Sequence, residues 1–219
     1  MLTIIPDTNR IIQKGWIKYY EFLPEKDPDF TFCSAATGID PAVSQKDWAD
    51  FTAMVSAKIY FHQDQLRLYI LPHPVNERLS THQSLRRAKE ISERLGQGNQ
   101  TVLYIEDVGT QRFFIDSVKK EGCPVQPVPT LGIDKRNRLM AVSQYLEMGQ
   151  VYFPKQGAEV LISQLLGFGA EKHDDLVDAF TIIVGELFKR SHLPTSWPED
   201  TDDHSDSRLT FDGLLDQQF

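Results

Sequence analysis

The run TVLYIED at residues 101–107 constrains the fold more than any other feature of the sequence. Four consecutive apolar residues are followed by two acids, Glu106 and Asp107. A strand that is covered on one face only alternates apolar and polar residues, whereas a continuous apolar run is typical of a strand buried on both faces. Such a strand requires packed layers on both sides of its sheet. The run therefore favours an α/β fold with helices on both faces.

The remaining patterns place strands and helices in alternation around this run. The first three strands are expected to be antiparallel, because 51–61 and 66–73 are joined by a polar turn at 62–65. The later strands alternate with helices, which implies an α/β sandwich. The sequence therefore predicts a mixed central sheet flanked by helices. We expect strands at 30–40, 51–61, 66–73, 101–107, 123–130 and 151–154, and helices at 80–95, 110–121, 134–148, 158–166 and 173–189.

The 219 residues suffice for one domain with appendages. We interpret residues 1–29 as a lead-in segment with a short helix, 30–190 as the domain, and 191–219 as an acidic, flexible tail. Seven acids and one base at 199–219 give that part −6 of the total charge of −8. The other residues are thus nearly neutral at −2. This balance neither demands nor excludes a nucleic-acid partner, because a local basic stripe suffices for binding DNA.

Several classes of protein are disfavoured. No apolar run approaches the ~20 residues of a membrane span, and the first residues lack the apolar core of a signal peptide, so we expect a cytosolic protein without a membrane partner. Cys33 and Cys123 provide no disulfide framework. The motifs of P-loop ATPases, dinucleotide-binding folds, serine hydrolases, zinc ribbons and zincins are absent. The residues that remain as candidates for catalysis or ligand binding are carboxylates.

Three of these carboxylates end predicted strands. Asp40 ends the strand at 30–40 and precedes a proline, and the carboxyl ends of strands are where α/β folds bind ligands. Capping of the next turn is the alternative role for Asp40. Glu106 and Asp107 end the buried strand, and because successive side chains point to opposite faces, only one of them can face a given site. Capping of the following loop is again the alternative.

The motif KHDDLVDAF opens the last predicted helix, which is apolar around most of its circumference and therefore largely buried. Asp174 and Asp178 are spaced i, i+4, and Asp175 and Asp178 are spaced i, i+3, so they share one face. The helix dipole and capping explain Asp174 and Asp175. They explain Asp178 poorly, because it lies one turn deeper among apolar residues. Thr181 and Gly185 continue this row as a strip of small residues that allows close packing.

Separated carboxylates of this kind suit Mg²⁺ or Mn²⁺, which take oxygen ligands and keep several waters. Two such ions ~3.5–4 Å apart activate water and stabilise the leaving oxygen in phosphodiester cleavage. The carboxylates therefore favour a site for two divalent cations.

Four motifs follow one another along the sequence: GIDPA with DWADFTAMV, YIEDVGTQ, DKRNRLMAVSQYLEMGQVYFP and HDDLVDAF. Together and in this order they resemble the C-terminal nuclease domain of tailed-phage large terminases, and the similarity runs over residues 16–189. The resemblance implies a ribonuclease H-like fold, shared with Holliday-junction resolvases and integrases. It also implies a metal-dependent DNA endonuclease that cuts concatemeric viral DNA during genome packaging.

The resemblance assigns metal binding to five acids of this sequence. Asp40 matches the metal-binding acid of the first strand, and Glu106 matches the second acid, with Asp107 as the less favoured neighbour. Asp175 and Asp178 have the D-x-x-D-A spacing of the resolvase relatives, and the paired acids leave Asp174 open as a third candidate. Asp40, Glu106, Asp175 and Asp178 are the catalytic candidates.

Basic residues for DNA contact are expected at the start of the helix at 134–148. Lys135, Arg136 and Arg138 match a basic segment of the family, and phosphate contacts of this kind position DNA without reading its sequence. A solvated charged face is the alternative for these three. It is the favoured interpretation for the other basic groups, which are Arg86, Arg87, Lys89, Lys119 and Lys120.

Two further residues have open roles. His173 either assists proton transfer or caps the helix, and capping is favoured. Asp50 occupies a place where terminases often have an acid, and a role as a hairpin cap is equally open.

Large terminases normally carry an ATPase before this domain, so the sequence is expected to be a fragment or a split gene product. The implied partners are double-stranded DNA, a separate ATPase motor, the small terminase subunit and the portal. The implied location is the host cell cytoplasm during virion assembly. Two alternatives stay open: a Holliday-junction resolvase-like nuclease, and a non-catalytic remnant that serves as a docking module through its acidic tail.

Overall fold

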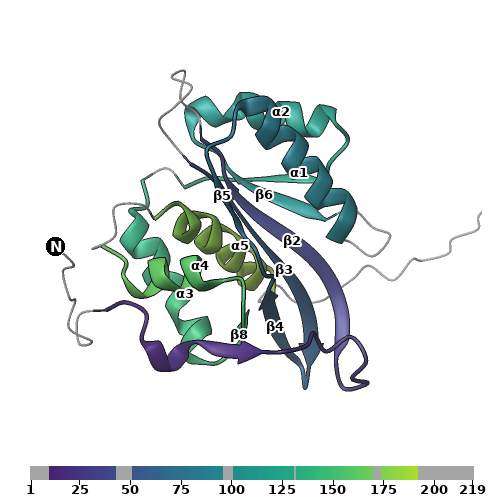
Figure 1. Ribbon diagram of the computed structural model, residues 1–219, viewed down its shortest axis with the longest axis vertical. Coiled ribbons are helices and arrows are strands. Elements are labelled where there is room, and N and C mark those ends of the chain that lie inside the picture. The colour runs from purple at the N-terminus through teal and green to yellow at the C-terminus, as the bar shows by residue number, and fades with distance from the viewer. Residues whose placement is uncertain (1–9, 43–50, 96–100, 131, 170–173, 192–219) are drawn as a thin grey trace, which may run out of the picture.

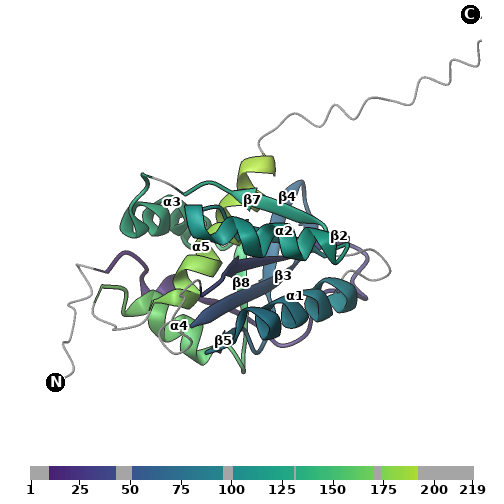
Figure 2. The same cartoon turned by 90° about the horizontal axis from the view of Figure 1, so that it is seen from above.

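The computed structural model describes residues 10–42, 51–95, 101–130, 132–169 and 174–191. A central sheet lies between two helical layers (Figure 1). Helices α1 (Thr81–Leu95) and α2 (Arg112–Lys120) lie side by side on one face, as the view from above also shows (Figure 2). The other face carries α3 (Lys135–Glu147), α4 (Glu159–Leu166) and α5 (Asp175–Ser191). The predicted helices on both faces of an α/β fold are confirmed.

The sheet is mixed, as predicted. Its order is β1-β8-β4-β3-β2-β6-β7, and β5 pairs with one end of β3. The pairs β2–β3, β3–β4 and β3–β5 are antiparallel, whereas β2–β6, β6–β7, β4–β8 and β1–β8 are parallel. The proline-containing strand β7 lies at an edge, where a missing N–H donor is tolerated. The strands are β1 (Lys18–Tyr20), β2 (Thr31–Asp40), β3 (Thr52–His62), β4 (Gln65–Ile70), β5 (Val75–Glu77), β6 (Val102–Glu106), β7 (Val125–Val128) and β8 (Val151–Pro154).

The turn between β3 and β4 is the expected polar one. Gln63 and Asp64 both have left-handed backbone angles, with φ of 50° and 58°. Two consecutive positive φ values are the signature of a type I′ turn, whose twist matches that of the flanking antiparallel strands. The turn thus fixes the register of this hairpin.

Part of the segment interpreted as a lead-in joins the sheet. A short 3₁₀ turn at Lys14–Trp16 precedes β1, which pairs with β8, and Ile12 and Ile17 are buried in the core. Within the described ranges, no helix is long and apolar enough to cross a membrane.

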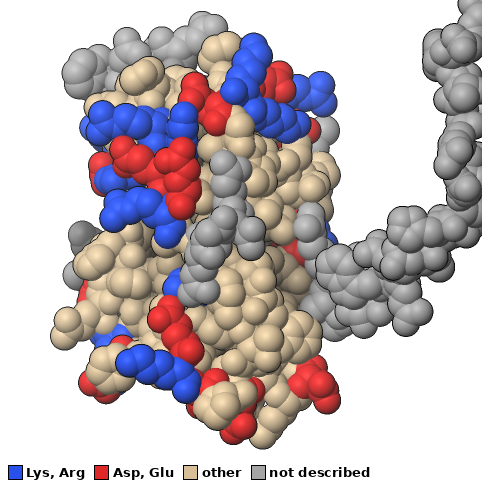
Figure 3. Space-filling model, turned by 90° about the vertical axis from the view of Figure 1, so that its right-hand side faces the viewer, with Lys and Arg blue, Asp and Glu red and all other residues tan. Residues whose placement is uncertain are grey.

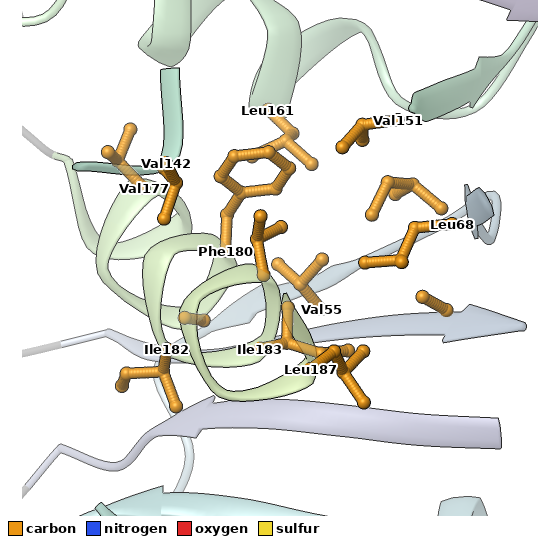
Figure 4. Close-up of a cluster of buried hydrophobic side chains, with 14 of the residues drawn as sticks. Val55, Leu68, Val142, Val151, Leu161, Val177, Phe180, Ile182, Ile183 and Leu187 are labelled. Atoms are coloured by element: carbon orange, nitrogen blue, oxygen red, sulfur yellow. The ribbon is translucent and has the colours of Figure 1, made fainter. Parts of the chain in front are cut away.

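Helix α5 is buried on nearly all sides, as its composition predicts. Figure 4 shows its apolar side chains packed among residues of β3, β4, β8, α3 and α4. The α5 residues labelled there are Val177, Phe180, Ile182, Ile183 and Leu187, and their neighbours are Val55, Leu68, Val142, Val151 and Leu161.

Strand β6 is covered on both faces. Leu103 and Ile105 pack in the cluster under α1 and α2, whereas Tyr104 packs in the cluster around α5. Strand β2 alternates in the same way, because Ala36 belongs to the α5 cluster and Ile39 to the other. This alternation decides which acids face α5 at the ends of these strands.

Gly38 brings α5 unusually close to β2. A Cβ atom built on Gly38 would lie 2.1 Å from the carbonyl oxygen of Ala179 and 3.0 Å from the Cβ of Ile183. The backbone of α5 therefore rests directly on the strand at a position where only glycine fits. On β2, Gly38 lies two residues before Asp40, and on α5 its contact Ala179 directly follows Asp178.

We expect Gly38→Ala to lower the free energy of unfolding by about 2–3 kcal/mol, because the added methyl group must push α5 away from β2. Gly15→Ala is the matched control, since a Cβ there would meet no atom within 4 Å. Urea denaturation of both variants measures the difference. Equal stability of the two variants would show that α5 can move without cost.

Candidate functional site

Three acids from three elements meet at one end of the sheet. Asp40 is the last residue of β2 and Glu106 is the last residue of β6, and these parallel strands are neighbours with Ile39 opposite Ile105. Asp178 lies in the first turn of α5, the helix that rests on β2. The structure thus brings together three of the predicted site residues.

The alternation along β6 separates Glu106 from Asp107. Glu106 shares the side of Tyr104 and faces the α5 layer. The carboxylate of Asp107 instead accepts a hydrogen bond of 3.3 Å from Nε of Arg112 at the start of α2. Glu106 is therefore the acid of this pair that joins Asp40 and Asp178.

Arg138 of α3 bridges two of the acids. Its Nη1 donates to Oε1 of Glu106 and its Nη2 to Oδ1 of Asp178, both at 2.7 Å. The side chain of Arg138 is only 12% exposed, that of Glu106 13% and that of Asp178 4%. One guanidinium therefore ties the end of β6 to the first turn of α5 by charge-assisted bonds.

Lys135 lies one helical turn before Arg138 and contacts the same cluster from its rim. Its Nζ is 2.5 Å from Oδ2 of Asp178 and 3.1 Å from Oδ1 of Asp174. The Lys135 side chain is 49% exposed, in contrast to the enclosed Arg138. Two of the three cations that sequence analysis assigned to DNA, Lys135 and Arg138, thus point at the acids.

Glu106 has two further hydrogen-bond donors that sequence analysis missed. Thr130 donates to Oε1 at 2.6 Å, and the amide of Gln111 donates to Oε2 at 3.4 Å. Because β7 pairs in parallel with β6 and Val128 lies opposite Glu106, a polar residue just after β7 falls beside this carboxylate. That register is the signal that would have pointed to Thr130.

The carboxylates of the site repel one another, and Lys135 and Arg138 offset this repulsion only in part. Burial, together with the carboxylates of Asp178 and Glu106, raises the pKa of Asp40 to about 8. Burial also raises the pKa of Asp178, despite the nearby Lys135 and Arg138. Burial acts to lower the pKa of Lys135, but the carboxylates of Asp178 and Asp174 outweigh it and raise this pKa above its usual value.

The other two acids of the motif lie at the start of α5. Asp174 directly precedes the helix, and its carbonyl oxygen accepts from the N–H groups of Val177 and Asp178. Asp175 is the first residue of the helix and contributes to the raised pKa of Asp40. Asp178 is the innermost of the three, and Asp174 lies nearer the surface.

The N-terminus of α3 is occupied by its own cap. The side chain of Asp134 accepts a 2.9 Å hydrogen bond from the backbone N–H of Arg136, while the Arg136 side chain is exposed. Of the three predicted DNA contacts, Arg136 is therefore the one that points to solvent.

Three basic residues of α1 are paired on the surface. Arg86 lies 3.2 Å from Glu90, Arg87 lies 3.5 Å from Glu77, and Lys89 lies 2.8 Å from Glu121. Figure 3 shows blue and red side chains next to each other in its upper part. This arrangement is that of a solvated charged face. His173, Asp50 and the tail after residue 191 lie outside the described residues.

The acids fit a divalent cation by their chemistry. In the part of the chain that the structure describes, no three His, Cys, Asp or Glu side chains are arranged to hold a metal ion, and Lys135 and Arg138 bond the carboxylates instead. The donors are nevertheless the oxygens that Mg²⁺ and Mn²⁺ prefer. The raised pKa of Asp40 also reflects crowded carboxylates that a cation would stabilise in their charged form.

The fold is that of solved terminase nucleases. The chain is similar to the large terminase nuclease from thermophilic phage G20c with bound zinc, at 16% identity and a TM-score of 0.54, covering 78% of this chain and 95% of that one. The same nuclease with bound magnesium gives 16% identity and a TM-score of 0.53, with coverages of 83% and 99%. The HK97 bacteriophage large terminase gives 12% identity and a TM-score of 0.52, covering 81% of this chain but 43% of that one.

No curated protein matches the chain in sequence. Residues 37–185 match the family model of the terminase RNaseH-like domain, and this range contains Asp40, Glu106 and all three acids of α5 and its start. The predicted ribonuclease H-like fold is thereby confirmed. Because the match spans more than half of the chain, the protein belongs to the family of terminase RNaseH-like domains.

Proposed function

We propose that this chain is a divalent-metal-dependent DNA endonuclease that cuts viral DNA during genome packaging. Membership of the terminase RNaseH-like family supports a nuclease. The observation that carries the proposal is the convergence of Asp40, Glu106 and Asp178 from β2, β6 and α5 at one end of the sheet. Lys135 and Arg138 neutralise part of this cluster, but burial and the neighbouring carboxylates still raise the pKa of Asp40 to about 8, and a bound divalent cation would relieve this crowding.

Asp40, Glu106 and Asp178, with Asp174 just before α5 and Asp175 at its first position, would hold Mg²⁺ or Mn²⁺. Two such ions would activate a water molecule and stabilise the leaving oxygen of a phosphodiester. Thr130 and Gln111 orient the Glu106 carboxylate through their hydrogen bonds, and Gly38 lets α5 bring Asp178 to β2. The divalent metal is further supported by the G20c nuclease structures with bound zinc, magnesium and cobalt.

The proposed substrate is double-stranded DNA, held through its phosphates by exposed cations such as Arg136. The chain spans 43% of the HK97 large terminase that it matches, so contacts with an ATPase motor, a small terminase subunit and a portal belong to the proposal. A nuclease of this kind would act in the host cell cytoplasm.

The proposal is tested by incubating the purified chain with supercoiled plasmid in EDTA, Mg²⁺ or Mn²⁺. We expect nicked and linear DNA with either metal and intact plasmid in EDTA. Asp116→Ala is a suitable control, since it removes an exposed carboxylate of α2 and should leave cleavage unchanged. Intact plasmid with both metals would contradict the proposal.

A further inference from the structure

Two cations of α3 contact the acidic cluster in different ways. Arg138 is enclosed and bonds Glu106 and Asp178 through separate nitrogens at 2.7 Å. Lys135 reaches Asp178 and Asp174 with its single ammonium group from a side chain that is half exposed. Both residues lie in α3, so the difference between them lies in their side chains.

We propose that Lys135 is an exchangeable counterion of this cluster. It neutralises Asp178 and Asp174 in the metal-free chain and leaves them when a divalent cation binds, while Arg138 stays in place. This inference rests on the proposed function, because it takes the acids to be the ligands of a divalent cation.

The chemistry of the two side chains explains why lysine exchanges and arginine stays. An ammonium group is a compact, well-hydrated charge on a flexible stem, so the exposed Lys135 can return to water at low cost. The planar guanidinium of Arg138 would lose two charge-assisted bonds to acids on different elements. Its departure would also separate the ends of β6 and α5, which the cation site needs together.

The cluster is therefore never without positive charge. Lys135 reduces the repulsion among carboxylates before a metal arrives, and the metal must compete with it for Asp178. The released ammonium group would then lie at the rim of the site, where a DNA phosphate is expected. By linkage, a phosphate that binds free Lys135 would favour metal binding as well.

Calorimetric titration of Mn²⁺ into the full chain tests the exchange. Lys135→Ala removes the competing cation, so we expect it to bind Mn²⁺ about tenfold more tightly than the unchanged chain. Lys89→Ala is the matched control, because it removes an exposed lysine paired with Glu121 away from the site, and should bind like the unchanged chain. Equal or weaker binding by Lys135→Ala, with clear binding by the unchanged chain, would overturn the exchange and leave the nuclease proposal standing. No Mn²⁺ binding by any of the three proteins would overturn both.

A second measurement needs no variant of the site. Acylation of lysines by an amine-reactive ester, read by peptide mass spectrometry, reports whether Lys135 is held by the acids. We expect Lys135 to react several-fold faster in Mn²⁺ than in EDTA, whereas Lys89 reacts equally in both. Equal reactivity of Lys135 in the two conditions would overturn the exchange, and a purely electrostatic effect of Lys135 on metal affinity would not produce the difference.

Discussion

Replacing Asp40 with asparagine is expected to abolish metal-dependent cleavage of DNA while the chain stays folded. The asparagine keeps the shape of the side chain but removes the charge that would hold the cation between β2 and its neighbours. The loss should be at least about a thousandfold in the cleavage rate, because charge stabilisation of the transition state by the metal is worth several kcal/mol. Initial rates of plasmid nicking in Mg²⁺ measure this loss.

The same variant should be at least as stable as the unchanged protein in EDTA. Burial and the carboxylates of Asp178 and Glu106 raise the pKa of Asp40 to about 8, so a neutral side chain is favoured at this position in the metal-free chain. Thermal unfolding followed by circular dichroism separates loss of activity from loss of fold. Asp116→Asn serves as the control, since its exposed carboxylate lies on α2. Full cleavage by Asp40→Asn would remove Asp40 from the site.

Replacing Arg138 with methionine is expected to lower the free energy of unfolding in EDTA by about 3–5 kcal/mol. The substitution keeps an apolar stem but removes the guanidinium that bridges the largely buried side chains of Glu106 and Asp178. Lys135 still contacts Asp178, so Glu106 is the acid that loses its ion pair. Removing one partner of a buried ion pair costs more than the pair itself contributes, because the remaining charge stays desolvated. Urea denaturation in EDTA measures the change.

Arg67→Met is the matched control for this prediction. Arg67 is also partly buried, but it donates a 2.7 Å hydrogen bond to the neutral hydroxyl group of Tyr152, so its loss should cost only about 1 kcal/mol. The double variant Arg138→Met with Glu106→Gln should recover part of the stability, because the Glu106 carboxylate would otherwise be left with the neutral donors Thr130 and Gln111. A cost for Arg138→Met no larger than that for Arg67→Met would show that the bridge contributes little.

Much of the fold follows from periodicity in the sequence. The apolar run before Glu106 predicted a strand covered on both faces, and the nearly uniform apolar surface of the last helix predicted that α5 is buried. Each of these two patterns involves several residues, so the prediction does not depend on any single position. Strands β1 and β5 were not predicted, because three residues each are too few to display a period and their pairing depends on β8 and β3.

The acids of the site could be selected from the sequence, but not their partners. Strand ends and helix spacing picked out Asp40, the pair Glu106 and Asp107, and the three acids at the last predicted helix, because these positions are local features. The resemblance to terminases then favoured Glu106 over Asp107. The partners of Arg138 lie 32 and 40 residues away, and nothing in the sequence shows which way its guanidinium points. Gly38 was likewise missed, since its close contact with Ala179 depends on how α5 packs on β2. The orientation of Arg138 and the close contact of Gly38 both depend on long-range packing, which residue type alone does not reveal.

Acids from β2, β6 and α5 are proposed to form one divalent-cation site, and anomalous X-ray scattering from crystals of the full chain grown with Mn²⁺ tests this most directly. We predict manganese density in contact with the carboxylates of Asp40, Glu106 and Asp178, with Arg138 still beside Glu106 and Lys135 released from Asp178. Manganese density elsewhere, or none while Lys135 and Arg138 keep their bonds to the acids, would contradict the account.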